Sequence, residues 1–185
     1  HQPTDLKGDF EEKFIDKYFC NFSIFQSTPD IWGLNQIFPI LPLHRLNEIP
    51  QHKVRLHDLT CDSDGQIDHY VENDSIESYL SLHQLHSEQD YILGLFLVGA
   101  SQEPLGDLHN LFGNTTTVNI ELNPDGGYKI CGEEPGDTIE EILSCVHIDT
   151  TKIHHIWLEK LTQMGVSETI KKFVLHELET SLNTN

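Results

Sequence analysis

Apolar side chains recur at every second position in the middle of the chain, which is the spacing of strands. Residues 53–57 and 115–122 both alternate between apolar and polar side chains. The stretch 123–127 reads Asn-Pro-Asp-Gly-Gly, a strong turn signal, and residues 128–131 continue as a returning strand. Residues 91–98 are apolar apart from one glycine, as expected for a strand that is buried on both faces. The pattern predicts a small sheet or barrel of several strands.

The two ends of the chain show the spacing of amphipathic helices instead. Residues 5–18 predict a helix, and the alternation over residues 20–25 predicts a strand directly after it. Residues 31–38 predict one or two helical turns. The last part of the chain predicts three helices, the first with a capping box at Thr138 and the third capped by Ser167. A helix that runs directly into a strand is typical of the end of an α/β unit, so we expect further chain before the given N-terminus.

Composition restricts the class of protein and its partners. The chain has 185 residues, enough for one compact domain or one domain with an appended piece, and 37% of them are hydrophobic. Lys and Arg number 11 against 30 Asp and Glu, and the net charge of -19 argues against nucleic acid or an anionic membrane as a partner. The longest apolar run is too short to span a bilayer, and the N-terminus lacks the pattern of a signal peptide. We therefore expect a soluble cytoplasmic protein.

Patterns for metal binding are weak. None of the four cysteines forms a C-x-x-C pair, and no H-E-x-x-H occurs among the 12 histidines. The Asp-rich stretch 62–68 looks like a calcium loop, but EF-hand spacing would place Thr60 and Val71 at the first and last ligand positions. The residues therefore predict no metal site.

Cys61 lies where a predicted strand ends and a turn begins, and Asp62 and Asp64 follow it. Neighbouring carboxylates favour the protonated form of a thiol, so this side chain could donate a proton at neutral pH. The two carboxylates could also bind a planar guanidinium or an ammonium group. An ordinary turn with a half-buried cysteine fits the same spacing, and the residues alone leave both interpretations open.

Five segments resemble, in order and spacing, the biosynthetic arginine decarboxylases. The first reads N-F-S-I-F-Q-S-T-P-D-I-W-G and is similar to the N-F-S-x-F-Q-S-x-P-D-x-W segment of that family. The third includes C-D-S-D-G, and the fifth reads L-G-D-L-H-N-L-F-G. The resemblance covers residues 18–122, with a weaker helical match to the end. The five segments are residues 21–33, 38–43, 58–65, 93–100 and 105–113.

The resemblance implies an α+β chain from the C-terminal portion of a PLP-dependent decarboxylase with the alanine racemase-like fold, fold type III. In that family an N-terminal (β/α)8 barrel carries the Schiff-base lysine and the phosphate-binding loops. We expect residues 1–50 to be the end of that barrel and the crossover, residues 51–135 to be the mostly β C-terminal barrel or sandwich domain, and residues 136–185 to be a helical addition. None of the nine lysines lies in a segment that resembles the cofactor-lysine strand. We therefore expect the chain alone not to hold PLP covalently and to be inactive.

The resemblance also implies roles for single residues. Cys61, supplied across a dimer interface, would protonate the Cα of the substrate after CO2 has left. Asp62, and less directly Asp64, would line the pocket for the distal cation of the substrate. Asp30 and Trp32 would also face the substrate, without a defined role.

One departure from the family concerns the cofactor. The family usually has a tyrosine after Gly-Ala whose hydroxyl reaches the PLP phosphate, and this chain has Ser101 there. A serine hydroxyl is shorter and would reach the phosphate only through a water molecule. Ser101 is thus the expected cofactor contact of this chain, with weaker PLP binding as a consequence.

The function implied by the resemblance is the conversion of L-arginine to agmatine and CO2 in polyamine biosynthesis, which leads to putrescine and spermidine. The expected partners are the remaining barrel domain and a second copy, in a homodimer or a larger homo-oligomer. The family also implies Mg²⁺, although the residues show no carboxylate cage for it. The alternative is a non-catalytic module that dimerises with or regulates a full-length decarboxylase, which the missing lysine and Ser101 favour. A decarboxylase for ornithine, lysine or diaminopimelate fits the motifs less well.

Overall fold

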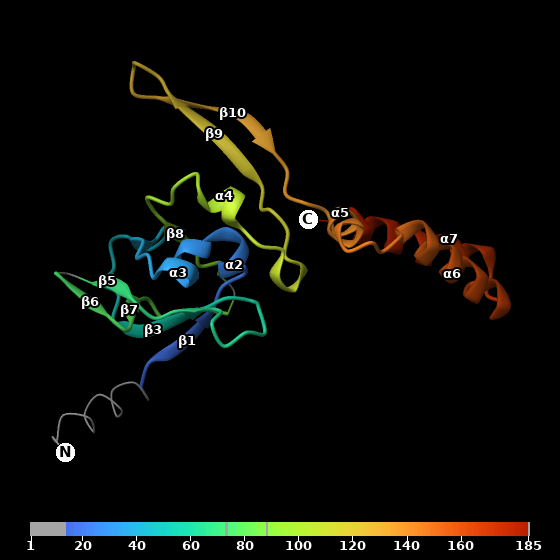
Figure 1. Ribbon diagram of the computed structural model, residues 1–185, viewed down its shortest axis with the longest axis horizontal. Coiled ribbons are helices and arrows are strands. Elements are labelled where there is room, and N and C mark those ends of the chain that lie inside the picture. The colour runs from blue at the N-terminus through green and yellow to red at the C-terminus, as the bar shows by residue number, and fades with distance from the viewer. Residues whose placement is uncertain (1–13, 73, 88, 185) are drawn as a thin grey trace. The chain divides into compact units, whose positions relative to one another are not determined.

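The computed structural model describes residues 14–72, 74–87 and 89–184. The chain divides into two compact units, His1–Asn110 and Leu111–Asn185. In the described residues, strands and short helices make up the first unit, while a hairpin and longer helices make up the second (Figure 1). The segment boundaries expected at residues 50 and 135 stay a prediction.

One strand organises the sheet of the first unit. β3 (His52–His57) pairs in parallel with β1 (Asp16–Phe19). It pairs antiparallel with β7 (Leu80–Leu82) through its first half and with β4 (Gln66–Ile67) through its last two residues. Three strands therefore depend on β3 for their hydrogen bonds, and β3 is the centre of this sheet (Figure 1).

The core of the first unit is built on β3. Val54 and Leu56 are 0% and 1% exposed, which confirms the alternation predicted for this strand. Tyr70 crosses the core: its hydroxyl accepts a hydrogen bond from Leu56 N at 2.8 Å and donates one to the carbonyl oxygen of Ile67. Burial raises the pKa of the Tyr70 phenol, so the hydroxyl keeps the proton that it donates. The buried core residues are Ile24, Phe25, Ile40, Val54, Leu56, Ile67, Tyr70, Leu80 and Leu82.

The structure corrects the prediction for the start of the described chain. Asp16–Phe19 is the strand β1, where the spacing predicts the end of a helix, and most of that predicted helix lies outside the described residues. The strand predicted over residues 20–25 is wrong, because the chain turns there into α2 (Ile24–Ser27). Ser23 accepts a hydrogen bond from Gln26 N, and this N-cap begins a helix where the alternation alone predicts an extended chain.

Two small antiparallel pairs complete the described strands of the first unit. β2 (Ile40–Pro42) pairs with β8 (Leu93–Leu95), and β5 (Tyr70–Glu72) pairs with β6 (Ser75–Glu77). The prediction of one strand over residues 91–98 that is buried on both faces is wrong. Only β8 is a strand there, and its side chains stay half-buried because it belongs to a two-stranded sheet.

Short helices connect these strands. α3 (Pro29–Leu34) starts with a proline at its first position and confirms part of the helical turns predicted over residues 31–38. α4 (Gln102–Leu105) is a single turn, and the 3-10 helix η1 (His109–Leu111) follows it. Of the residues that the sequence singles out, Asp30 and Trp32 lie in α3, and Ser101 lies immediately before α4.

The second unit begins with the predicted hairpin. β9 (Thr117–Leu122) pairs antiparallel with β10 (Tyr128–Glu134), and the turn lies at residues 123–127 as predicted. The returning strand is longer than the predicted one. A bulge near Gly132 shifts the register, and the φ of 63° at this position favours glycine.

Three helices follow the hairpin, in agreement with the sequence. They are α5 (Ile139–Cys145), α6 (Thr150–Gln163) and α7 (Glu168–Leu182). The predicted capping box at Thr138 and the predicted cap at Ser167 both form, each with a side-chain oxygen that accepts a hydrogen bond from a backbone N–H of the first turn. The three helices predicted for the end of the chain are therefore present.

The fold is mixed α and β, as predicted. The strands that the structure describes do not close into a barrel. Within the described ranges, no helix has the length and apolar character needed to cross a bilayer.

Candidate functional site

Cys61 lies in a tight turn that begins where β3 ends. Asp58 N donates to the Gly65 carbonyl oxygen at 2.9 Å across the base of the turn, and Gly65 N donates to the Asp62 carbonyl oxygen at 3.1 Å. A Cβ on Gly65 would lie 2.2 Å from Asp58 Oδ1, so glycine is required at this position. These contacts fix the backbone around Cys61 without using its side chain.

A buried carboxylate holds this turn against α2. Asp58 is 3% exposed, and its Oδ2 accepts a hydrogen bond from Ile24 N at 2.9 Å. Its Oδ1 accepts from Thr60 N at 2.9 Å and from Thr60 Oγ1 at 2.8 Å. Ile24 N belongs to the first turn of α2, where the N–H groups have no carbonyl partner within the helix. Asp58 thus joins the start of α2 to the Cys61 turn, a role that the sequence analysis did not assign to it.

The side chains of Cys61 and Asp62 each meet a residue of η1. Asn110 Nδ2 donates a hydrogen bond to Cys61 Sγ at 3.1 Å. His109 Nε2 is hydrogen-bonded to Asp62 Oδ2. The side chains of Asp62 and His109 are 44% and 37% exposed, so solvent or a ligand can reach them. We call Cys61, Asp62, His109 and Asn110 the thiol–carboxylate cluster.

Aromatic rings support this cluster from the core side. The buried Phe25 ring of α2 lies against the imidazole of His109, with ring centroids 4.4 Å apart and planes inclined by 37°. The Trp32 ring, from α3, makes a T-shaped contact with the same phenyl ring, with centroids 5.2 Å apart. Trp32 is thereby joined to Asp62 through two intervening residues, Phe25 and His109.

A glycine brings η1 close to α2. A Cβ on Gly106 would lie 2.5 Å from the carbonyl oxygen of Gln26, so the chain can pass α2 at this distance only without a side chain. The next residue, Asp107, donates its N–H to the Phe25 carbonyl oxygen at 3.1 Å. The segment that carries His109 and Asn110 is therefore placed by backbone contacts with α2.

Asp30 has a partner of its own. Asp30 N donates to Gln102 Oε1 at 3.1 Å, and Gln102 Nε2 donates back to Asp30 Oδ2. Gln102 is 4% exposed, so this reciprocal pair joins α3 to α4 inside the unit. The structure therefore gives Asp30 a positioning contact, and its predicted role toward the substrate stays a prediction.

The other predicted site residues lie at the surface. Asp64 is exposed on the Cys61 turn, where its carbonyl oxygen accepts a hydrogen bond from Gln66 N at 2.8 Å. Ser101 is exposed immediately before α4, and its side chain makes no capping hydrogen bond to that helix. The predicted roles of both residues stay predictions.

The thiol–carboxylate cluster can perform two chemical tasks. An accessible S–H can deliver a proton to a carbon atom, and an accessible carboxylate can bind a planar cation. The part of the chain described here holds no group of three or more His, Cys, Asp or Glu side chains arranged around a metal position. The cluster thus suits proton transfer and cation binding.

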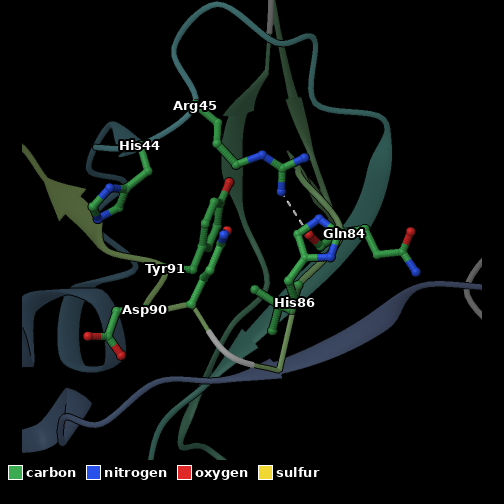
Figure 2. Close-up of a pocket in the computed structure, with 8 residues that line it drawn as sticks. His44, Arg45, Gln84, His86, Asp90 and Tyr91 are labelled. Atoms are coloured by element: carbon green, nitrogen blue, oxygen red, sulfur yellow. Dashed lines mark hydrogen bonds between the residues drawn. The ribbon is translucent and has the colours of Figure 1, made fainter.

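A cavity of about 350 Å³ lies elsewhere in the first unit and shares no lining residue with the cluster. Figure 2 shows the Arg45 guanidinium and the Tyr91 ring beside it, with Arg45 Nη1 donating to the Gln84 carbonyl oxygen at 2.9 Å. The lining residues are His44, Arg45, Gln84, Leu85, His86, Gln89, Asp90 and Tyr91.

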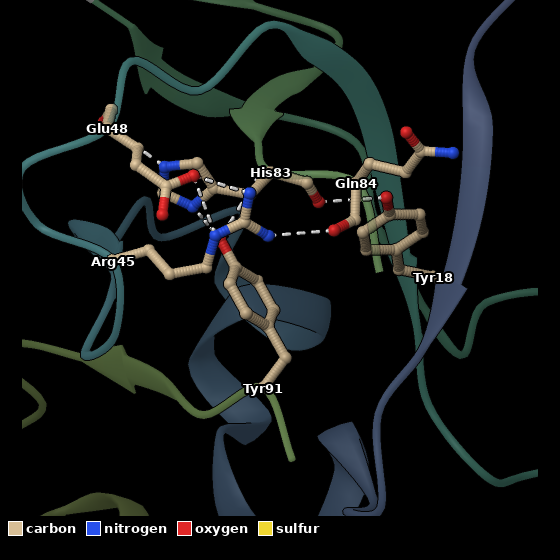
Figure 3. A network of polar contacts seen from close by, with 6 residues as sticks. All are labelled: Tyr18, Arg45, Glu48, His83, Gln84 and Tyr91. Carbon is tan, nitrogen blue, oxygen red and sulfur yellow. Dashed lines mark hydrogen bonds and ion pairs between the residues drawn. The ribbon is translucent and has the colours of Figure 1, made fainter. Parts of the chain in front are cut away.

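The polar groups beside this cavity are bonded to one another (Figure 3). Arg45 Nε donates to Glu48 Oε2 at 2.9 Å; this hydrogen bond raises the pKa of Arg45 and lowers that of the Glu48 carboxyl. His83 Nδ1 lies 2.7 Å from Tyr91 Oη, and Tyr18 Oη donates to the His83 carbonyl oxygen at 3.0 Å. The Arg45 guanidinium is already paired with Glu48. We therefore assign this network a structural role, which is to hold these loops together.

Sequence reasoning did not identify His109, Asn110 or Phe25 as site residues. His109 and Asn110 belong to the fifth segment of the family resemblance, and that was the available signal. No spacing rule connects them to the Cys61 turn, because the contact is made between distant parts of the chain.

Comparisons with known proteins agree with the resemblance. No family model matches the chain. A biosynthetic arginine decarboxylase of Pseudomonas aeruginosa is 50% identical over 153 residues, which are 83% of this chain and 24% of that protein. A biosynthetic arginine decarboxylase of Xylella fastidiosa is 44% identical over 183 residues, which are 98% of this chain and 28% of that protein. The crystal structure of the biosynthetic arginine decarboxylase SpeA from Campylobacter jejuni matches with a TM-score of 0.78 and 42% identity, over 91% of this chain and 28% of that one.

The chain spans about a quarter of the length of the curated relatives that it matches. The Xylella match covers 98% of this chain, and the TM-score is that of a shared fold. The resemblance to the biosynthetic arginine decarboxylases is therefore confirmed. Over the segment that it spans, the chain belongs to the family of the biosynthetic arginine decarboxylases.

Proposed function

We propose that this chain is the part of an arginine decarboxylase that returns a proton to the substrate and binds its distal cation. The complete enzyme would convert L-arginine to agmatine and CO2 for polyamine synthesis. The observation that carries the proposal is the exposed Cys61 thiol, which lies beside Asp62 on a turn fixed by buried contacts.

The family implies PLP as the cofactor, whose electron-withdrawing ring makes the loss of CO2 possible. The residues of the thiol–carboxylate cluster do not fit this cofactor. Covalent binding needs a lysine, and the thiol–carboxylate cluster contains none. The Asp62 carboxylate would repel a phosphate, and Ser101 is the hydroxyl that this chain could offer instead. We therefore propose that the PLP lysine and the phosphate-binding loops belong to the barrel domain, and that Ser101 is the contact this chain adds to the phosphate.

In the proposed reaction, this chain carries out one covalent step, the transfer of a proton to Cα. When the bond between Cα and the carboxyl carbon breaks, CO2 leaves and the bonding electron pair stays with Cα. The Cys61 S–H transfers its proton to Cα, which forms the new C–H bond and leaves a thiolate. Because Cys61 is exposed, the thiolate takes a proton from solvent and the cycle closes.

The carboxylates of the turn would bind the other end of the substrate. A guanidinium presents parallel N–H donors that match a carboxylate, and an exposed Asp62 can accept them. Asp64 would add a second negative charge on the same turn. These charges favour a substrate with a distal cation, and the planar fork of arginine fits a carboxylate better than an ammonium does.

The remaining expectations belong to the complete enzyme. We propose that this segment works with a barrel domain and a second copy, in a cytoplasmic homodimer or larger homo-oligomer, and that the segment alone is inactive. The described carboxylates do not gather into a site for Mg²⁺, so we assign that ion to no residue of this chain.

The test is a chimera in which this chain replaces the matching quarter of the Pseudomonas aeruginosa decarboxylase. We expect the chimera to release CO2 from L-arginine. Replacing Cys61→Ala should slow this release by about 100-fold or more, because a positioned general acid contributes at least that much. Bound PLP, measured by its absorbance, should be unchanged.

The matched control is Cys145→Ala, which removes another exposed thiol in the second unit and should leave turnover unchanged. A chimera that binds PLP but does not release CO2 would favour the alternative of a non-catalytic module. Full turnover in Cys61→Ala would show that another group donates the proton.

A further inference from the structure

We propose that His109 and Asn110 are positioning residues: the imidazole fixes the orientation of Asp62, and the amide fixes the sulfur of Cys61. This inference rests on the proposed function of the thiol–carboxylate cluster. It adds two residues to which neither the family resemblance nor the comparisons assign a role.

The amide of Asn110 is directed at the sulfur. Its Nδ2 donates to Cys61 Sγ at 3.1 Å, so the sulfur is an acceptor in this contact. The thiol proton is then free to point away from the amide, toward a substrate carbon. The backbone supports this geometry, since Asn110 has a φ of 56° and asparagine tolerates the left-handed region better than most residues.

The imidazole of His109 is fixed on two sides. Its face lies against the buried Phe25 ring, and its Nε2 is hydrogen-bonded to Asp62 Oδ2. A carboxylate can only accept, so Nε2 carries the shared proton. The stacked ring therefore holds one oxygen of Asp62, and Oδ1 becomes the oxygen through which the carboxylate receives a guanidinium N–H.

The two contacts share one support. His109 and Asn110 are neighbours in η1, and η1 follows the close passage of Gly106 past α2. Asp62 and Cys61 are neighbours in the turn that Asp58 ties to the same helix. The neighbouring residues His109 and Asn110 therefore orient both the proton donor and the cation-binding carboxylate.

The role of Asn110 is tested on this chain by alkylation with iodoacetamide, followed by peptide mass spectrometry. Asn110→Gly keeps the left-handed backbone and removes the donor. We expect the rate at Cys61, relative to Cys145 in the same molecule, to fall by about three-fold, because an N–H donor stabilises the reactive thiolate. Asn35→Gly is the matched control, since Asn35 is also exposed with a φ of 52°. An unchanged or increased ratio in Asn110→Gly would overturn the assignment.

The role of His109 is tested on this chain by 15N NMR of the imidazole. We expect the neutral ring to carry its proton on Nε2, and the Nε2 resonance to shift when Asp62→Ala removes the acceptor. A ring protonated on Nδ1, or one indifferent to Asp62→Ala, would contradict the contact. Neither this measurement nor the alkylation depends on catalysis, so both stand even if the chimera does not decarboxylate arginine.

Kinetics of the chimera then separate positioning from simple folding. His109→Phe keeps the ring against Phe25 and removes the donor, so KM for arginine should rise by about ten-fold with a smaller change in kcat. His109→Gln restores an N–H donor and should recover part of the loss. If His109→Phe leaves kcat/KM unchanged while the unaltered chimera is active, the positioning role is wrong and the proposed function survives.

Discussion

Asp58 shows how much a single residue contributes to the candidate site. Its buried carboxylate accepts three hydrogen bonds, one from the start of α2 and two from Thr60. Buried carboxylates are stable only when their oxygens are fully bonded, so this residue and its partners form one unit. The position of Cys61 therefore depends on a residue that does not itself reach solvent.

We expect Asp58→Asn to lower the free energy of unfolding by about 2–3 kcal/mol, since an amide nitrogen would replace one accepting oxygen and face an N–H group. Urea denaturation of this chain measures the change. Asp74→Asn is the control, because Asp74 is exposed and its substitution should have little effect. Equal stabilities of the two variants would contradict the role of Asp58.

At the scale of elements, α2 connects the parts of the site. The first N–H of α2 donates to Asp58, which also holds the Cys61 turn. At the other end of α2, Gly106 fits close to the helix backbone because it has no side chain. Gly106 has a φ of -58°, which any residue can adopt, so the requirement for glycine comes from space alone.

Gly106→Ala should therefore displace the segment that carries His109, because its Cβ would meet backbone rather than a flexible side chain. We expect a loss of about 1–3 kcal/mol in the free energy of unfolding, as for other overpacked sites. Gly33→Ala in α3 is the control: its Cβ would have nothing within 4 Å, and alanine favours helix. Thermal unfolding of both variants tests the expectation.

Elements with strong local signals are the ones that the sequence predicted. The alternation in β3, the hairpin turn at 123–127, and the caps at Thr138 and Ser167 are decided by neighbouring residues, and all are present. The alternation over residues 20–25 predicts a strand, whereas Ser23 caps a helix there and the distant Asp58 accepts a hydrogen bond from its first N–H. Long-range hydrogen bonds of this kind cannot be predicted from the spacing of apolar and polar residues along the chain.

The candidate site likewise has one part that the sequence predicts and another part that it does not. Cys61, Asp62 and Asp64 lie close together in the sequence, so the sequence itself predicts a turn that carries a thiol and two carboxylates. Their partners His109 and Asn110 come from a distant segment, and only the fold brings them together. The roles that the family implies for Asp30, Trp32 and Ser101 need a substrate and a cofactor, and they stay predictions.

At the scale of the whole molecule, one half-buried histidine links stability to pH. His57 lies at the end of β3, and its Nε2 is buried without a hydrogen-bond partner among the described residues. Burial lowers the pKa of His57, and the nearby charges of Lys17 and Arg55 add to the effect. The folded chain therefore disfavours the protonated imidazole.

The unfolded chain takes up this proton near the usual histidine value of about 6.5, before the folded chain does. The free energy of unfolding should thus fall as the pH drops below that value, and it should be independent of His57 above it. We expect His57→Gln to reduce the loss of melting temperature between about pH 7.5 and about pH 5.5. His155→Gln, at an exposed position, is the control and should behave like the unaltered chain.

The hydrogen bonds to Asp58 also determine how often the turn around Cys61 opens. The amide protons of Ile24 and Thr60 share one buried acceptor group, although one begins a helix and the other lies in an exposed turn. Releasing either of them leaves a buried carboxylate short of a donor, so the two should open together. We expect both amide protons to exchange with deuterium at a common slow rate, close to that of the Leu56 amide in the core. The turn that presents the thiol would then open only when the core of its unit opens.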